Sequence, residues 1–309
     1  MSSWPTATAG GLAVIAAVMA GMMTYVVIET PPPGPGLAVW VLLCATVVAL
    51  LGAVDDVFDF PASWKLAVQI GVALAFSIFV SRVEILPIAP GLELPLGPWL
   101  GALGTVIWLI VMINAYNFMD GSDGLAVGVQ SIGLFTLALV NPDRPILAFV
   151  LLVASISNLV FLPYNHPGRR IFQGDCGAMF SSFIIAGCSV LLATGPNPHA
   201  TLYIGAFVAA PFLVDVLLTL ARRARAKRRL FQAHNDHLYQ RWMRIGGHSA
   251  GALAWRVWGL TAVCAAVGFL VDSISPDWSL TILLILIGLL SLGWALLSRG
   301  LDARAMPTG

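Results

Sequence analysis

The uncharged stretch VLLCATVVALLGAV, from Val41 to Val54, leads directly into Asp55 and Asp56. It is one of many apolar stretches in a chain of 309 residues that is 59% hydrophobic and only 10% charged, with a mean hydropathy of +0.89. Soluble domains carry about 25% charged residues. The apolar stretches reach roughly 20 residues, the length that crosses a bilayer as a helix. The sequence therefore predicts an all-α, polytopic transmembrane helical bundle.

The apolar stretches predict a single integral membrane domain, residues 1–309, with about ten membrane-spanning helices. The connectors between them form two sets that alternate along the chain. One set contains only Arg82 and Arg144, and the other, counted with the adjacent Lys65 and Arg256, contains the remaining 14 of the 16 Lys and Arg. This asymmetry favours a cytoplasmic location for the basic set. The expected spans are 10–28, 37–54, 64–81, 99–116, 125–140, 146–163, 178–194, 201–221, 252–271 and 278–298.

Four polar islands lie at the ends of these spans, all on the predicted cytoplasmic side. Acidic residues are costly near lipid and are rarely kept there without a partner. A shared cation and a phosphorylated substrate would supply such a partner. The islands are Asp55-Asp56, the run from Asn114 to Gly124, Gly174-Asp175-Cys176-Gly177, and the segment from His234 to His237.

The first island places two carboxylates side by side. Two such charges about 5 Å apart repel by roughly 3 kcal/mol at an effective dielectric near 20, and a divalent ion would reverse this. Asp55 and Asp56 therefore either hold a cation or accept a proton, or they form a solvated helix end. Lys65, ten residues after Asp55, binds phosphate or extends its ammonium group to the lipid headgroups.

The second island points most strongly to a binding site. Asn114, Asn117, Asp120 and Asp123 recur at every third position, directly after an apolar run. The glycine after each aspartate predicts that the helix opens around Asp120 and leaves backbone N–H groups free for an anion. Two amides and two carboxylates are more than a solvated turn requires.

The remaining islands are more ambiguous. Asp175 between glycines is typical of a helix N-cap, and it is also a suitable oxygen ligand for Mg²⁺. His234 and His237, with Arg241 nearby, fit a pyrophosphate or a sugar better than zinc. The basic run 222–229 marks topology and contacts anionic lipids. We interpret Asp215 as the partner of Arg222 in an ion pair.

Together the islands resemble the polyprenyl-phosphate N-acetylhexosamine-1-phosphate transferases over nearly the whole chain. This family includes enzymes that start O-antigen and other surface polysaccharides, and the muramoyl-pentapeptide transferase of peptidoglycan synthesis. The stretch from Asn114 to Gly124 is similar to the specific family signature Asn-x-x-Asn-x-x-Asp-Gly-x-Asp-Gly. Leu51 to Asp56 resembles the first aspartate-rich motif, Phe172 to Gly177 the Gly-Asp motif, and His234 to Arg241 the histidine loop of the O-antigen-initiating branch.

Two departures from the family pattern stand out. Ala178 occupies the position of a serine that would cap or orient Asp175. Thr8, in the stretch 5–11, occupies the position of a basic residue in a family loop. Family members usually have another membrane helix before that loop, so we expect either that the true start lies upstream or that this chain lacks the first helix of the family.

The resemblance implies transfer of a sugar 1-phosphate from a UDP-N-acetylhexosamine to polyprenyl (undecaprenyl) phosphate, with release of UMP. The implied location is the bacterial inner membrane, with the catalytic loops in the cytoplasm. Mg²⁺, for which Mn²⁺ is a substitute, would be held by Asp175 and Asp120. The implied catalytic residues are Asp55, Asp56 and Asp120, and the implied substrate-binding residues are Lys65, Asn114, Asn117, Asp123, His234, His237 and Arg241.

Two other functions are considered. A CDP-alcohol phosphotransferase also carries repeated aspartates, but its motif needs an arginine that is missing after Asp120-Gly121. An ion-coupled transporter would place its acidic residues near mid-membrane rather than at one face. Binding of a UDP-sugar would separate an enzyme from a carrier. No nucleic-acid partner is expected, and a homodimer is left open.

Overall fold

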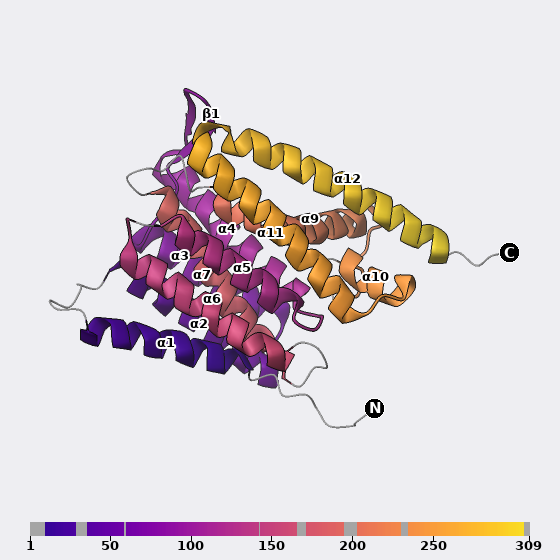
Figure 1. The fold of residues 1–309 in the computed structure, drawn as a ribbon, viewed down its shortest axis with the longest axis horizontal. Helices are drawn as coiled ribbons and strands as arrows, with labels where there is room; N and C mark the ends of the chain where they lie inside the picture. Colours follow the sequence, from indigo (N-terminus) through magenta and orange to yellow (C-terminus); the bar gives the residue numbers. More distant parts are fainter. Residues whose placement is uncertain are drawn as a thin grey trace.

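The computed structural model describes residues 10–28, 36–58, 60–141, 143–165, 171–194, 203–229 and 234–305. Within these residues, nine helices are long and apolar enough to cross a membrane. A tenth apolar helix, α5, has only 15 residues. The all-α, polytopic bundle is confirmed (Figure 1). The helices are α1 (Gly10–Ile28), α2 (Leu37–Phe58), α3 (Ala62–Phe79), α4 (Gly97–Met119), α5 (Leu125–Leu139), α6 (Pro145–Asn165), α7 (Gly174–Ala193), α9 (Ile204–Arg225), α10 (Leu238–Gly246), α11 (Ala250–Ile274) and α12 (Ser279–Ala305).

Helix α7 forms the centre of the bundle. Its most apolar 18-residue window is fully buried, whereas the corresponding window of the last span, which includes α12, is only 6% buried. Helices α1, α2, α4 and α5 pack around α7, and α9, α11 and α12 lie together on one side (Figure 1). The first turn of α7 therefore lies where several other helices begin or end.

Glycine at position 52 sets how closely α2 approaches α7. A Cβ atom at this position would lie 2.6 Å from the carbonyl carbon of Asp175 and from the amide nitrogen of Cys176. Real Cβ atoms do not come so close to backbone. A residue with a side chain would therefore push the two helices apart, only one turn before Asp55 and Asp56.

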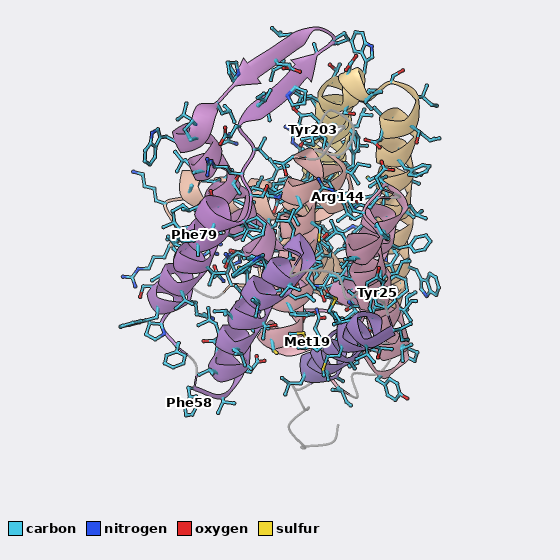
Figure 2. The ribbon with its side chains drawn as sticks, turned by 90° about the vertical axis from the view of Figure 1, so that its left-hand side faces the viewer. Met19, Tyr25, Phe58, Phe79, Arg144 and Tyr203 are labelled. Carbon is cyan, nitrogen blue, oxygen red and sulfur yellow. The ribbon has the colours of Figure 1, made fainter. Side chains whose placement is uncertain are left out.

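The helices divide the molecule into two ends. We call the end where α2, α4, α9 and α12 finish and α7 begins the basic end, because the run from Arg222 to Arg229 lies there. At the other end, β1 (Ile85–Ala89) and β2 (Leu92–Pro95) form an antiparallel hairpin with Leu86 opposite Leu94. Figure 2 shows this hairpin projecting above Tyr203, far from Phe58 at the basic end. The Tyr203 hydroxyl donates a hydrogen bond to the carbonyl oxygen of Pro87.

Several boundaries differ from those expected. Helix α2 continues to Phe58 and includes Asp55 and Asp56, and α12 continues to Ala305 rather than ending at 298. The hairpin and the short helix α10 were expected to be connectors. Helices end where the backbone loses its hydrogen bonds rather than where hydrophobicity ends, which explains the longer elements. Thr8 and the rest of 1–9 lie outside the described residues.

Candidate active site

Four segments bring polar side chains together at the basic end. Asp55 and Asp56 come from the last turn of α2, and Lys65 comes from the first turn of α3. Asp120 directly follows α4, and Asp175 lies in the first turn of α7. These segments are far apart in the sequence, and the packing of α2 and α4 on α7 gathers them. We call Asp55, Asp56, Lys65, Asn117, Asp120 and Asp175 the carboxylate cluster.

Lys65 links two of the carboxylates. Its Nζ lies 2.6 Å from Asp55 Oδ2 and 3.8 Å from Asp175 Oδ2. The backbone N–H of Phe60 also donates to Asp55 Oδ1 at 2.8 Å. The side chain of Asp55 is consequently only 8% exposed and fully engaged. Asp55 therefore positions Lys65, while the neighbouring Asp56 stays exposed.

Asp56 and Asn117 both contact the start of α7. The backbone N–H of Asp175 donates to Asp56 Oδ1 at 3.2 Å, and Asn117 Nδ2 donates to Asp175 Oδ2 at 3.2 Å. A carboxylate at a helix N-terminus accepts a hydrogen bond from a free N–H group and interacts favourably with the helix dipole. The N-cap interpretation of Asp175 is therefore wrong. Gln173 is the cap residue, and Asp56 of α2 supplies the carboxylate.

Asp120 is the carboxylate of the cluster whose pKa is shifted furthest. Burial raises its pKa well above the usual carboxyl range, and the charges of Asp175 and Asp56 raise it further. The fully buried side chain of Gln173 lies beside it. An acid that loses this much solvation gains most from a nearby cation.

Helix α4 ends at Met119, and the chain opens after Asp120, as predicted. Gly124 has a φ of +67°, a conformation that favours glycine. Its N–H is not free for an anion, however, because it donates to Asn165 Oδ1 at 2.8 Å. Asp123 is buried, and Asn114 Nδ2 donates to Gln69 Oε1 at 2.7 Å, within the bundle.

The histidine segment reaches the cluster through Phe118. The rings of His234 and His237 lie 4.9 Å apart, and His237 stacks on Phe118 with centroids 6.0 Å apart. The Tyr239 hydroxyl donates to the Phe118 carbonyl at 3.1 Å. Burial lowers the pKa of both histidines, which favours their neutral form. His237 thus lies beside the loop that carries Asp120.

Asp215 holds this segment in place, a role that the sequence did not reveal. Its carboxylate accepts hydrogen bonds from the N–H of Leu238 at 2.8 Å and of Tyr239 at 3.2 Å, at the start of α10. Trp294 Nε1 donates to the same carboxylate at 3.0 Å. The predicted ion pair with Arg222 is wrong, since Arg222 binds Asp302 at 2.9 Å. The rule that buried acids keep partners did indicate that Asp215 was engaged.

Arg241 does not face the cluster. Its guanidinium is 5% exposed and binds Asp302 of α12 at 2.6 Å and Ser298 Oγ at 2.8 Å. Of the residues expected at one site, the structure thus gathers Asp55, Asp56, Lys65, Asn117, Asp120 and Asp175. It places His237 beside them and turns Asn114 and Arg241 toward other helices. Gln173 and Asp215 are additional residues that shape the site.

The cluster has the donor chemistry of a magnesium site that is completed by substrate. Among the described residues, no group of three or more His, Cys, Asp or Glu is arranged to hold a metal alone. Mg²⁺ usually takes one or two carboxylates and fills its remaining positions with water and phosphate oxygens. Asp120 and Asp175 meet that requirement, and both lack the solvation that would otherwise stabilise their charges.

Known proteins match this chain over most of its length. Residues 38–193, half of the chain, match the model of glycosyl transferase family 4. The chain is 29% identical to the Bacillus subtilis protein named "Probable undecaprenyl-phosphate N-acetylglucosaminyl 1-phosphate transferase", over 77% of its own length and 65% of that protein. It is 31% identical to the decaprenyl-phosphate N-acetylglucosaminephosphotransferase of Mycobacterium leprae, over 85% of its own length and 73% of that protein. Both the family match and the second relative lead to one conclusion: the chain belongs to glycosyl transferase family 4.

Proposed function

We propose that this membrane protein transfers an N-acetylhexosamine 1-phosphate from a UDP-sugar to a polyprenyl phosphate and releases UMP. The observation that carries the proposal is the meeting of Asp56, Asp120 and Asp175 beside Lys65 at the end of the bundle where most basic residues lie. Such an arrangement suits two phosphorylated substrates and a cation. The names of the relatives make UDP-N-acetylglucosamine the first donor to test.

The proposed reaction exchanges one phosphoanhydride for another. An oxygen of the lipid phosphate forms a bond to the phosphorus that carries the sugar. The bond from that phosphorus to the bridging oxygen breaks, and this oxygen keeps the electron pair and leaves with UMP. No water or oxidant is consumed, so catalysis rests on positioning and on stabilising charge.

The residues divide this work between the two substrates. Lys65, held by Asp55, is placed to bind the phosphate of the lipid. The exposed carboxylate of Asp56 is placed to orient that phosphate or to take its proton. Asp120 and Asp175 fit Mg²⁺, which supplies charge neutralisation at the pyrophosphate when bound. His237, beside the Asp120 loop, and His234, next to His237, are placed to donate hydrogen bonds to the nucleotide-sugar.

The lipid tail has an apolar approach to this site. Phe58 and Trp64 are 69% and 67% exposed, and they lie at the ends of α2 and α3 next to Asp55 and Lys65. Aromatic side chains at a helix end suit the boundary between lipid and headgroup. A polyprenyl phosphate can therefore present its phosphate to Lys65 while its chain stays in the bilayer. The basic residues at this end of the bundle favour a cytoplasmic location for it.

Release of UMP by the purified protein tests the proposal. We expect Mg²⁺-dependent UMP release from UDP-N-acetylglucosamine when a polyprenyl phosphate is supplied, and none without the lipid. Asp120→Asn and Asp175→Asn are each expected to lower the rate by about 100-fold or more. Asp277→Asn, the same substitution in the turn between α11 and α12 at the hairpin end, should retain the wild-type rate. Equal rates in all four proteins would remove the site assignment, and inactivity with every UDP-N-acetylhexosamine would remove the function.

A further inference from the structure

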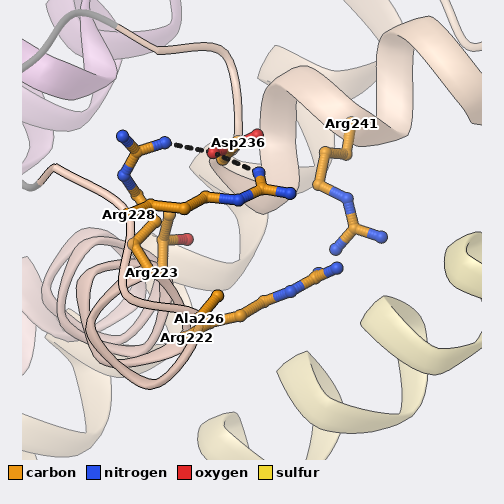
Figure 3. A pocket seen from close by; sticks show the side chains of 7 residues that line it. Arg222, Arg223, Ala226, Arg228, Asp236 and Arg241 are labelled. Atoms are coloured by element: carbon orange, nitrogen blue, oxygen red, sulfur yellow. Dashed lines mark hydrogen bonds and ion pairs between the residues drawn. The ribbon is translucent and has the colours of Figure 1, made fainter.

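A second polar cavity lies at the basic end, and none of its lining residues belongs to the carboxylate cluster. It has a volume of about 150 Å³ and is lined by residues of α9, of α10 and of the segment between them (Figure 3). A cavity of this volume holds more than one water molecule. The lining residues are Thr219, Arg222, Arg223, Ala226, Arg228, Asp236 and Arg241.

The floor of the cavity consists of two buried arginines. The side chains of Arg223 and Arg241 are 7% and 5% exposed. Arg223 binds Asp236 and donates to the carbonyl oxygen of Arg229, yet its Nε is buried and makes no hydrogen bond with any described residue. A buried guanidinium N–H without a partner costs free energy. The cavity lining therefore includes a buried guanidinium group whose charge a bound anion would help to balance.

The mouth of the cavity carries two more arginines. Arg222 is 43% and Arg228 is 63% exposed. Figure 3 shows the guanidinium ends of Arg222 and Arg241 pointing toward one another from α9 and α10. Asp302 and Ser298 of α12 hold both of them. Four guanidinium groups thus share two carboxylates, Asp236 and Asp302, which leaves excess positive charge around the cavity.

A strained turn brings Arg228 back over the cavity. Lys227, directly after α9, has a φ of +53°, a conformation that glycine normally occupies at a helix end. The N–H of Arg228 donates to the Arg223 carbonyl at 2.9 Å, and the N–H of Lys227 donates to the Ala224 carbonyl at 3.0 Å. These two bonds close the end of α9 and bring Arg228 close to Arg223. Both side chains then meet the same oxygen of Asp236.

Helix α12 lies beside the cavity, because its Asp302 and Ser298 bind Arg222 and Arg241. Leu296 and Leu297, in the turn that also carries Ser298, are 59% and 44% exposed. A ligand bound to the arginines would therefore have an apolar helix beside it. A water-soluble phosphate would make no favourable contact with that apolar surface, whereas the acyl chains of a membrane lipid would pack against it. Basic pockets at the cytoplasmic ends of membrane helices suit anionic headgroups.

We propose that the cavity between α9 and α10, beside α12, binds the phosphate group of an anionic membrane lipid. Arg222 and Arg228 contact the phosphate at the mouth of the cavity. The buried Arg223 and Arg241 add positive charge that attracts the phosphate from below. Guanidinium groups are well suited to phosphate because of their planar fork of donors. Because Asp236 lies between His234 and His237, the bound lipid also stabilises the histidine segment beside the carboxylate cluster. The site does not depend on the proposed transfer reaction.

Native mass spectrometry of the full chain with added phosphatidylglycerol tests the proposal. The test protein carries Arg222→Gln with Arg228→Gln. The matched control carries Arg225→Gln with Arg229→Gln, which removes the same charge from exposed residues outside the cavity. We expect the test protein to bind the lipid at least about tenfold more weakly than wild type, and the control to stay within about twofold. Equal weakening in both would show a diffuse surface charge effect and would overturn the site.

Two further measurements distinguish a lipid phosphate from a soluble phosphate as the ligand. Phosphatidylcholine, whose choline group neutralises its phosphate, should bind equally weakly to wild type and to the test protein. Inorganic phosphate alone should leave the melting temperature of wild type unchanged. If inorganic phosphate stabilises wild type but not the test protein, while phosphatidylglycerol binds both alike, the ligand is soluble and the lipid assignment is wrong. Size-exclusion profiles and melting temperatures verify that every variant is folded.

Discussion

At the scale of single residues, the candidate site depends on which partner each carboxylate has. Asp55 and Asp56 are neighbours in the sequence, yet Asp55 is buried against Lys65 and Asp56 reaches the first N–H groups of α7. Asp55 therefore holds Lys65 in position, and Asp56 stays available to substrate. The prediction of a polar cluster at these positions did not separate the two, because the partners come from other helices.

Lys65 is expected to be essential through its charge. Lys65→Gln removes the cation that lies 2.6 Å from Asp55 and 3.8 Å from Asp175, so the buried Asp55 and the partly exposed Asp175 lose their compensation. We expect a fall in UMP release of about 100-fold, with a larger effect on the rate than on the KM for the UDP-sugar. Lys227→Gln removes the only other lysine and serves as the matched control. Equal activity of the two variants would contradict the role of Lys65.

Asp236 gives a pH-dependent contribution to stability. Burial alone would raise its pKa, but Arg223 and Arg228 outweigh it and hold the pKa below the usual carboxyl range. A lowered folded-state pKa stabilises the protein above the unfolded value of about 3.9, and this contribution is lost as the pH falls toward the folded value. Asp236→Asn should therefore melt earlier than wild type by a constant margin above about pH 5. The margin should shrink below about pH 4. A margin that grows on acidification would contradict the assignment.

At the scale of elements, close packing of α2 on α7 brings the first two islands to the third. Gly52 allows that approach, and it is the only glycine in the apolar run from Val41 to Val54. Hydropathy predicted that α2 exists but not which face meets α7. The same limit explains why α10 was missed, since its short amphipathic sequence resembles a connector. The hairpin was not predicted because it contains prolines at positions 87 and 95, and proline is unusual within strands.

Gly52→Ala is expected to destabilise the protein and to disturb the site. The new Cβ would lie 2.6 Å from the backbone of Asp175, so α2 must move and Asp56 loses its contact with α7. Such overpacking costs about 1–3 kcal/mol. Gly71→Ala in α3 is the control, because nothing lies within 4 Å of its Cβ, and it should be neutral or stabilising. The melting temperatures of the two variants in detergent test this prediction. Similar values for Gly52→Ala and Gly71→Ala would contradict the packing argument.

Lys227→Gly is expected to stabilise the end of α9. A residue with a side chain at a φ of +53° carries roughly 1 kcal/mol of strain, which glycine removes. The melting temperature should rise, and a fall would show that the lysine side chain contributes more than its backbone strain costs.

At the scale of the whole molecule, the sequence predicted a helical membrane protein and most of its helix positions. It also predicted that the basic residues gather at one end of the bundle. Membrane helices are recognised by length and charge bias, which are local properties. Their arrangement around α7 was not predictable, because it depends on the direction in which each helix face points. For this reason Asp120 and Asp175 were correctly expected at the same end, whereas the contact of Arg241 with α12 was not foreseen.

Binding of a divalent cation tests the central claim, that Asp56, Asp120 and Asp175 share one site. Mn²⁺ serves as the probe, and its electron paramagnetic resonance spectrum is recorded with purified protein and UMP. We predict one bound Mn²⁺ in wild type and in Asp277→Asn, and its loss in both Asp120→Asn and Asp175→Asn. Retention of the bound Mn²⁺ in both cluster variants, with each of them folded, would contradict a shared cation site.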